Sequence, residues 1–173
     1  DNGDKWIGTE FGLAIFDDAN WTVLNTSNSG LPGDEVREIY KDRNGNFWIG
    51  TFLDGMAKFD GTNWTVFNTG NSPLPDNFVR AFAQDTADNF WIGTSGGLVK
   101  YDGDTTWEIH SMGNSPLLSN NIVSIYIDEA NIAYVGTING GLNVINDKIW
   151  DVYTLDNSDI NDNTILDIQA DVE

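Results

Sequence analysis

Few side chains in this sequence are of the types that carry acid–base or metal chemistry at fixed spacing. The 173 residues include one histidine, His110, and no cysteine. His110 falls at a position where equivalent segments carry Leu24, Phe67 and Tyr153, so we expect it to pack against its neighbours. Neither a catalytic triad nor a histidine or thiolate metal cluster is therefore predicted.

Carboxylates are the remaining candidates for general acid–base catalysis, and the chain has 27 Asp and Glu residues. Most of them recur with a repeat or lie in turns, as Asp42, Asp60, Asp85 and Asp102 do. Asp at such positions usually stabilises a turn through its side-chain oxygens. The sequence also contains no glycine-rich phosphate loop and no nucleophile elbow. We therefore predict that the chain is not an enzyme.

Calcium is the one metal that the sequence makes worth considering. Asp42, Asn44 and Asn46 place oxygen ligands at alternate positions, as at the start of a calcium-binding loop. The downstream bidentate glutamate of such loops is missing, and a hairpin alone explains the Asn44-Gly45 pair. Calcium is thus a possible ligand at Asp42, Asn44 and Asn46, and no other cofactor is expected.

A strong excess of acidic residues limits the possible partners. Eight Lys and Arg residues against 27 Asp and Glu give a formal charge of −19. Scattered cations cannot form the basic surface that nucleic acid or an anionic membrane requires. The apolar runs are of strand length, well short of the roughly 20 residues that a membrane helix needs. We predict no nucleic-acid partner and no membrane insertion.

The sequence repeats with a period of 43 residues. A Trp-Ile-Gly-Thr motif begins at residues 6, 48 and 91 and returns as Tyr-Val-Gly-Thr at residue 134. The first of these steps is 42 residues and the other two are 43. Four further series step by 43 throughout: Trp21, Trp64, Trp107 and Trp150; Asn28, Asn71, Asn114 and Asn157; Val36, Val79, Ile122 and Ile165; Asp42, Asp85, Asp128 and Asp171. Four such repeats account for nearly the whole chain.

Each repeat is predicted to be a four-stranded antiparallel meander. In the second repeat, β-rich runs cover residues 36–40, 47–51, 56–59 and 64–67. The Asn44-Gly45 pair predicts a type I′ hairpin turn, which needs positive φ at both central residues. Four strands per repeat at this period predict an all-β fold, a β-propeller with four blades of four antiparallel strands per chain. The glycine after each Trp-Ile pair would let a neighbouring blade approach closely.

The repeats begin and end out of phase with these strands. We treat residues 1–173 as one domain with repeats at approximately 1–33, 34–76, 77–119 and 120–162, and residues 163–173 completing the first blade. Such circularly permuted closure predicts either a four-bladed ring or one half of an eight-bladed ring made by two chains. Broad, tryptophan-filled blades favour the dimer. A third possibility is a segment cut from a longer array.

The repeated motif resembles the two-component regulator propeller repeat. The likeness rests on Asn-x-Val-x-x-Ile-x-x-Asp-x-x-Gly-Asn-x-Trp-Ile-Gly-Thr, followed by Phe/Tyr-Asp-Gly, Trp and Asn-Ser-x-Leu-Pro, and covers essentially the whole chain. The repeats beginning at Asp34 and Asn77 match best. The third has Leu117-Leu118 in place of Leu-Pro, and the fourth has Tyr134-Val135 for Trp-Ile. The resemblance implies a periplasmic or extracellular sensor region of a bacterial hybrid histidine kinase, many of which respond to oligosaccharides.

A ligand site is expected on the face that carries the long Asn/Ser/Pro connections. The other face has only tight Asn-Gly and Asp-Gly turns, which offer a ligand little, whereas recognition usually lies on loops held by a rigid scaffold. Equivalent positions at the entry to the first strand of each repeat, together with two nearby arginines, provide the candidates: Asp34, Arg37, Asn77, Arg80, Asn120 and Asn163. A turn-stabilising role would also explain the asparagines.

Three functions remain open at this point. The first is a non-catalytic ligand-binding or sensing propeller of the bacterial cell envelope, periplasmic or extracellular, with a polar ligand such as an oligosaccharide. The second is a structural module for protein–protein contacts. The third is a carboxylate-dependent glycan hydrolase or lyase, because propellers also host such enzymes. The third is ranked last because the sequence offers no active-site motif, and the first is the main prediction.

Overall fold

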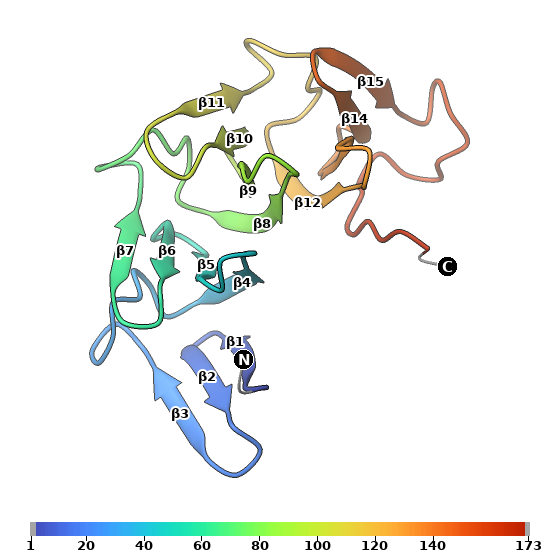
Figure 1. Ribbon diagram of the computed structural model, residues 1–173. Helices are drawn as coiled ribbons and strands as arrows, with labels where there is room; N and C mark the ends of the chain where they lie inside the picture. Colours follow the sequence, from blue (N-terminus) through green and yellow to red (C-terminus); the bar gives the residue numbers. More distant parts are fainter. Residues whose placement is uncertain (1–2, 172–173) are drawn as a thin grey trace. The chain divides into compact units, whose positions relative to one another are not determined.

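The computed structural model describes residues 3–171, which form fifteen strands in four antiparallel sheets and contain no helix (Figure 1). Contacts between residues divide the chain into two compact units, residues 1–79 and residues 80–173, which we call unit 1 and unit 2. No segment between residues 3 and 171 forms a helix that could cross a lipid bilayer. The predicted all-β fold is confirmed.

Unit 1 holds the first two sheets. Their strands are β1 (Lys5–Thr9), β2 (Gly12–Phe16), β3 (Trp21–Leu24), β4 (Val36–Lys41), β5 (Phe47–Thr51), β6 (Met56–Phe59) and β7 (Trp64–Phe67). The first sheet has the order β1-β2-β3 and the second β4-β5-β6-β7. Leu13, Leu31, Val36 and Ile49 are buried together between the two sheets.

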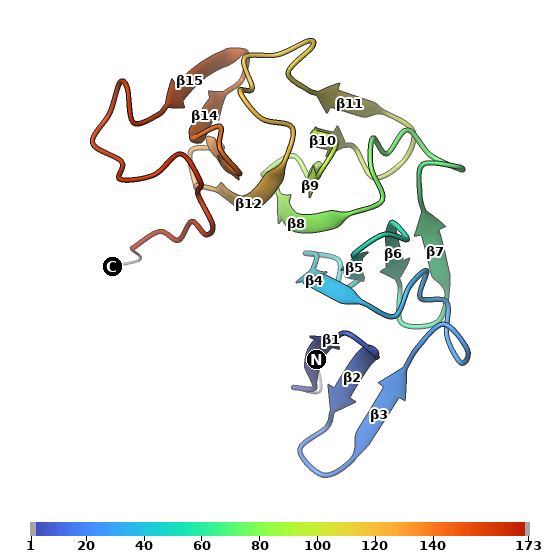
Figure 2. The ribbon, with the colours of Figure 1, turned by 180° about the vertical axis from the view of Figure 1, so that it is seen from behind.

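Unit 2 holds the other two sheets, which lie side by side in both views (Figures 1 and 2). Their strands are β8 (Val79–Gln84), β9 (Phe90–Thr94), β10 (Leu98–Tyr101), β11 (Trp107–His110), β12 (Ile122–Ile127), β13 (Ala133–Thr137), β14 (Leu142–Asn146) and β15 (Ile149–Tyr153). Each sheet follows the chain order, as a propeller blade does. Trp91, Leu98, Ile122 and Val135 belong to the core between them.

The glycine of each Trp-Ile-Gly-Thr motif lies against the aliphatic residue that begins a later first strand. A Cβ atom at Gly50 would be 2.7 Å from the backbone oxygen of Val79, and one at Gly93 would be 2.9 Å from Cγ2 of Ile122. Real Cβ atoms do not come this close to such neighbours. The predicted role of these glycines in close packing is confirmed.

The first turn of each repeat differs from the type I′ hairpin that Asn44-Gly45 predicts. Asp42 N donates to Asn46 O at 2.9 Å and Gly45 N donates to Asp42 O at 3.0 Å, which leaves a three-residue loop. Only Gly45 of the pair has positive φ, at 85°. A three-residue loop of this kind ends in one residue with left-handed backbone, and Asp88 and Asn131 take that place in later repeats. The prediction of a type I′ turn was wrong because the Asp42 side chain organises a longer turn.

The first sheet has three strands, and its edge strand β1 has no partner on one side among the described residues. Ile7 in β1 is 40% exposed, whereas the equivalent Ile49 is fully buried. Residues 164–171 form no strand, although Ile165 N donates to Thr137 O at 3.0 Å. Completion of the first blade by residues 163–173 therefore stays a prediction, and residues 172 and 173 lie outside the described part.

One buried amide has no partner. Asn143 in β14 is fully buried, and neither its Oδ1 nor its Nδ2 makes a hydrogen bond with the described residues. It lies opposite Val135 and Val152, and equivalent positions carry Ala57 and Val99. An unsatisfied buried amide opposes folding because it loses its hydrogen bonds to water.

We expect Gly50→Ala to lower the free energy of unfolding by about 1–3 kcal/mol, the usual cost of overpacking. The added methyl group would meet the Val79 backbone, which cannot move without shifting a whole strand. Urea unfolding measures the change. Gly113→Ala is the matched control, because its Cβ would meet nothing closer than 3.7 Å. Equal stability of the two variants would contradict this account of the repeated glycine.

We expect Asn143→Val to raise the free energy of unfolding by about 1 kcal/mol, because it removes a buried amide without partners. Thermal and urea unfolding of the variant beside the unchanged chain test this. Asn157→Val is the contrasting substitution, because Asn157 Oδ1 and Nδ2 both hydrogen-bond within their loop. A loss of stability in Asn143→Val would show that the amide has a role the hydrogen-bond pattern misses.

Candidate functional site

The four candidate residues at equivalent repeat positions hold the long connections in place. Each is half-buried, and its side-chain Oδ1 accepts a hydrogen bond from the backbone N–H eight residues earlier. The pairs are Thr26 to Asp34 (2.8 Å), Thr69 to Asn77 (2.9 Å), Met112 to Asn120 (2.7 Å) and Leu155 to Asn163 (2.9 Å). These side chains therefore already serve a structural role, the one that sequence analysis kept as the alternative for the asparagines.

The two candidate arginines differ in their surroundings. Arg37 pairs with Glu35, and its guanidinium lies 5.1 Å from the centre of the Phe52 ring. Arg80 is half-buried near the start of β8. The two belong to different compact units, so neither unit contains an arginine pair at these positions.

The candidate calcium loop is built around a carboxylate that already accepts several hydrogen bonds. Oδ1 of Asp42 accepts from the backbone N–H groups of Asn44 (2.9 Å) and Asn46 (2.8 Å). Its Oδ2 accepts from Asn46 Nδ2 (2.8 Å) and Trp48 Nε1 (3.0 Å). Burial opposes ionisation of Asp42, but these hydrogen bonds outweigh it and lower the pKa of the carboxyl. Between residues 3 and 171 no group of three or more His, Cys, Asp or Glu side chains is placed to hold a metal.

The same arrangement recurs one repeat later with a lysine added. Asp85 is 1% exposed, and its Oδ2 accepts from Trp91 Nε1 at 3.3 Å and lies 3.1 Å from Lys100 Nζ. Burial raises the pKa of Asp85, but hydrogen bonds from Asn89, Lys100 and Trp91 lower it further than burial raises it. Lys100 Nζ also lies 5.1 Å from the centre of the Trp91 ring. Asp85 thus fixes both the indole and the ammonium group.

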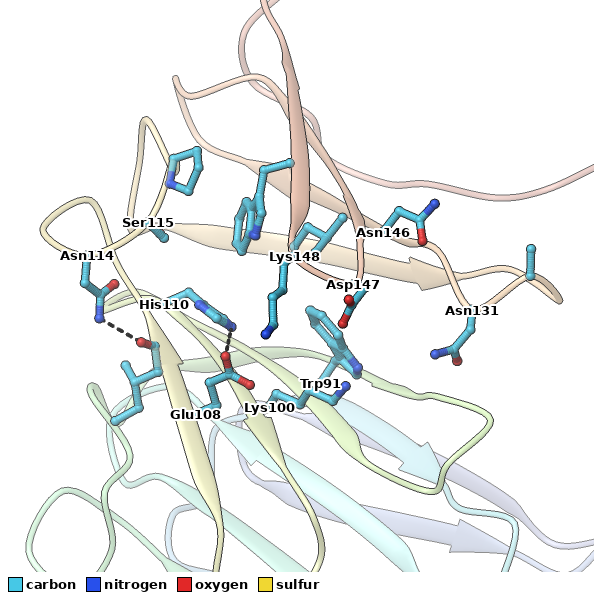
Figure 3. A pocket seen from close by; sticks show the side chains of 15 residues that line it. Trp91, Lys100, Glu108, His110, Asn114, Ser115, Asn131, Asn146, Asp147 and Lys148 are labelled. Carbon is cyan, nitrogen blue, oxygen red and sulfur yellow. Dashed lines mark hydrogen bonds and ion pairs between the residues drawn. The ribbon is translucent and has the colours of Figure 1, made fainter.

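A groove of about 610 Å³ opens beside this cluster in unit 2 (Figure 3). One wall comes from β9, β10 and β11, with Trp91, Lys100, Glu108 and His110. The other comes from the turn between β12 and β13, the turn between β14 and β15, and Trp150. Both indoles contribute apolar surface, and the rim is polar. This combination of aromatic faces with a few polar groups is common in sites for small polar ligands.

His110 is the titratable group at the centre of one wall. Its ring meets Trp150 edge to face with 5.2 Å between centroids, and its Nε2 lies 3.6 Å from Glu108 Oε1. Burial lowers the pKa of His110, while Glu108 opposes the shift, so the imidazole is neutral at pH 7. A neutral imidazole offers a ligand one donor and one acceptor.

Lys148 enters the groove from the opposite wall. It lies in the two-residue turn Asp147-Lys148 between β14 and β15, where Asp147 has φ of 54°. Figure 3 shows its amino group pointing toward the space between His110 and Trp91. The Lys148 side chain makes no hydrogen bond or ion pair with residues 3–171. Its ammonium group is therefore available to a ligand.

Unit 1 has a groove at the equivalent repeat position, of about 710 Å³. Trp6 there corresponds to Trp91, while Gly45 and Gly61 correspond to Asn131 and Asp147. The rings of Trp6 and Phe47 stack at 3.7 Å between centroids with 9° between their planes, and Phe59 completes the aromatic surface. This groove is more apolar than that of unit 2, because glycines stand where unit 2 has Asn131 and Asp147.

None of the six predicted ligand-binding residues lines either groove. Both grooves are lined by residues of the tight turns to which sequence analysis assigned no ligand role. The groove of unit 2 is also lined by Asn114, Ser115 and Pro116, which belong to one of the long Asn/Ser/Pro connections. One sequence signal could have indicated the groove of unit 2. Asp60-Gly61 and Asp102-Gly103 occupy this turn in the second and third repeats, whereas the fourth has Asp147-Lys148. A lysine at a hairpin tip in so acidic a chain is a break in the pattern.

Comparison with protein families agrees with the repeat seen in the sequence. Residues 30–52 and 73–96 match the family described as two component regulator propeller. These segments are similar to regulator propeller repeats. They span the entry to β4 and β8 and the strands β5 and β9, which carry the Trp-Ile-Gly-Thr motif. No curated protein matches the chain in sequence.

Solved structures with the same fold include extracellular domains of bacterial regulators. One, from a protein of B. thetaiotaomicron described as a putative hybrid two component system, is 28% identical over 89% of this chain, with a TM-score of 0.76. Another, described as a putative one component system of the same organism, is 22% identical over 98% of the chain, with a TM-score of 0.80. This chain spans only 22% and 24% of their lengths.

The same fold also occurs in an enzyme. Virginiamycin B lyase from Staphylococcus aureus is 14% identical over 92% of this chain and 54% of its own, with a TM-score of 0.68. At this identity the likeness concerns the fold alone.

We expect Asp85→Asn to lower the free energy of unfolding by about 2 kcal/mol at pH 7, the effect of losing hydrogen bonds to a charged group. The folded pKa of Asp85 is lowered, so its contribution is complete above about pH 4 and disappears as the pH falls through the folded pKa. The difference between the variant and the unchanged chain should therefore shrink as the pH falls below about 4. Urea unfolding at several pH values measures it. Asp151→Asn, on the exposed side of β15, is the control and should show no such dependence.

Proposed function

We propose that the chain is part of a non-catalytic sensor region outside the bacterial cytoplasm, periplasmic or extracellular, that binds a polar ligand such as an oligosaccharide. The observation that carries this proposal is the likeness, over 89% of the chain, to the extracellular domain of a protein described as a putative hybrid two component system. The two regulator propeller repeats support the same assignment.

The groove of unit 2 is the best place for such a ligand. Sugars present both hydroxyl groups and apolar C–H faces, and aromatic side chains with nearby hydrogen-bonding groups suit both. Trp150 offers an aromatic surface, and His110, Lys148 and Glu108 offer donors and acceptors around it. The candidates Asp34, Asn77, Asn120 and Asn163 support the loops instead, since their Oδ1 atoms are already engaged.

The charge state of the buried carboxyls supports binding without catalysis. The general acid of a glycoside hydrolase needs a raised pKa so that it holds a proton near neutral pH. Asp42 and Asp85 are buried, yet hydrogen bonds lower the pKa of both carboxyls. Their role is to stay ionised and hold turns, which is the opposite of a proton donor.

A panel of bacterial and plant oligosaccharides tests the proposal by isothermal titration calorimetry with the intact chain. We expect at least one to bind, and Lys148→Ala and Trp150→Phe to weaken it about tenfold, because each removes one contact of the groove. Lys5→Ala is the matched control: Lys5 pairs with Asp18 and lines neither groove. Binding unchanged in both groove variants would contradict the site.

Prolonged incubation with each bound oligosaccharide, followed by mass spectrometry, tests the non-catalytic part of the proposal. We expect every ligand to be recovered intact. Shortened or unsaturated products that disappear with a groove substitution would contradict it and favour a hydrolase or lyase.

A further inference from the structure

Lys148 differs from the other basic residues of the chain because it has no partner within it. The chain contains eight Lys and Arg residues against 27 Asp and Glu residues. Among residues 3–171, Lys148 makes no hydrogen bond, ion pair or ring contact. The other seven each interact with another group of the chain: Lys5, Arg37, Lys41, Arg43, Lys58, Arg80 and Lys100. The Lys148 ammonium group is therefore the cation that the folded chain leaves for an outside partner.

The repeat does not require a lysine at this place. The corresponding turns of the second and third repeats, Asp60-Gly61 and Asp102-Gly103, contain none. In the fourth repeat the two-residue turn between β14 and β15 holds Lys148 at the groove of unit 2. Figure 3 shows its amino group directed between His110 and Trp91. A charged side chain that folding does not need, and that points into a groove, is suited to binding a ligand.

Asn131 supplies a hydrogen-bond donor on the same wall of the groove. Its Oδ1 accepts hydrogen bonds from Thr86 N at 2.9 Å and from Thr86 Oγ1 at 3.0 Å. These two bonds fix the amide, and its Nδ2 donates to no acceptor in the described part of the chain. Asn131 belongs to the turn between β12 and β13, which lies at the same end of the sheet as the turn between β14 and β15. The wall thus offers a ligand both an ammonium group and an amide N–H.

The other lysine of the groove is balanced by the chain itself. Lys100 Nζ lies 3.1 Å from Oδ2 of Asp85. Hydrogen bonds lower the pKa of Asp85, so its carboxyl is ionised at neutral pH and cancels the charge of Lys100. Within residues 3–171, Lys148 is therefore the positive charge of the groove that no ion pair neutralises.

Two carboxyl groups of the groove limit the negative charge that a ligand can bring. Glu108 and Asp147 line the groove, and in the described part of the chain neither forms an ion pair with Lys148. The Glu108 side chain is 63% exposed, with 3.6 Å between its Oε1 and Nε2 of His110. Because like charges repel, a phosphate group or a densely sulfated chain brings more charge than one ammonium group balances. One carboxylate per ligand fits this arrangement.

A carboxylate suits the Lys148 ammonium group better than a hydroxyl group does. The ammonium group gives up water when a ligand covers it, and the ligand has to replace those hydrogen bonds. Hydrogen bonds between ionised partners are roughly twice as strong as neutral ones. A wholly neutral oligosaccharide would therefore leave the charge of Lys148 poorly compensated.

We propose that the ligand of this groove is an oligosaccharide in which one sugar carries a carboxylate, as a uronic acid does, and that Lys148 binds that carboxylate. This inference rests on the proposed function, the binding of an oligosaccharide in the groove of unit 2, and names the class of ligand. The Asn131 amide N–H donates to a hydroxyl group, and Trp150 packs against the apolar face of a neighbouring neutral sugar.

Isothermal titration calorimetry of the intact chain with matched pairs of ligands tests the inference. Each pair consists of a short oligosaccharide with one uronic acid and the same oligosaccharide after reduction of its carboxylate to an alcohol, which removes the charge. We expect the acidic member of at least one pair to bind about tenfold more tightly than the reduced member, the effect of a hydrogen bond to a charged group. Lys148→Met should abolish this difference, and Lys148→Arg, which keeps the charge, should retain most of it.

Lys5→Met is the matched control. It changes the net charge by the same amount, but Lys5 lines neither groove, so the preference for the acidic member should remain. Thermal unfolding of Lys148→Met should match that of the unchanged chain, because Lys148 makes no hydrogen bond or ion pair within residues 3–171. Added salt should weaken the binding of the acidic member and leave that of the reduced member unchanged.

The possible results separate this inference from the proposed function. Reduced members that bind as tightly as acidic ones, or a preference that Lys148→Met leaves unchanged, would overturn the role of the carboxylate while oligosaccharide binding still stood. Binding of neutral oligosaccharides alone would do the same. If no oligosaccharide of either kind binds, the proposed function fails, and this inference fails with it.

Discussion

The structure depends on a buried carboxylate that connects three strands of one sheet. Asp85 follows the first strand of its sheet, accepts the backbone N–H groups of the turn, and binds the indole of Trp91 on the second strand. Lys100 on the third strand completes the contact. Because the charge is buried, each of these donors is needed, and their positions become fixed. The Asp85 carboxylate therefore fixes the orientation of Trp91, which forms part of one wall of the groove in unit 2.

Sequence reasoning predicted the parts of the fold that repeat. The 43-residue register located every strand of the second repeat, and the glycines at 50 and 93 were correctly assigned to close packing. A type I′ turn at Asn44-Gly45 was wrong, because dipeptide preference ignores the Asp42 side chain that accepts two backbone N–H groups of the turn. A side chain that accepts hydrogen bonds from the backbone of a turn can override the turn type that the dipeptide alone favours.

The candidate site was harder to predict because it arises where the repeat is broken. Asp34, Asn77 and Asn120 attracted attention through their regular spacing, but polar residues that recur in every repeat serve each blade alike and hold its loop. The groove of unit 2 instead uses His110 and Lys148, each present in one repeat only. Its formation also needs two sheets to meet at a particular distance, which spacing along the sequence does not reveal. The groove proposed as the ligand site is therefore marked in the sequence by individual departures from the packing motif.

The contact made by the glycine of each Trp-Ile-Gly-Thr motif has a consequence for how such proteins change over time. Gly8 packs against Val36 in unit 1, and Gly93 packs against Ile122 in unit 2, so the same contact between a glycine and an aliphatic side chain recurs along the chain. Because these contacts are alike, a gene could gain or lose an entire 43-residue repeat and leave equivalent contacts on both sides. A single substitution of the glycine or of its aliphatic partner instead disrupts one contact, and no other residue restores it. Length should therefore drift freely among descendants of this array while the residues of these contacts stay nearly fixed.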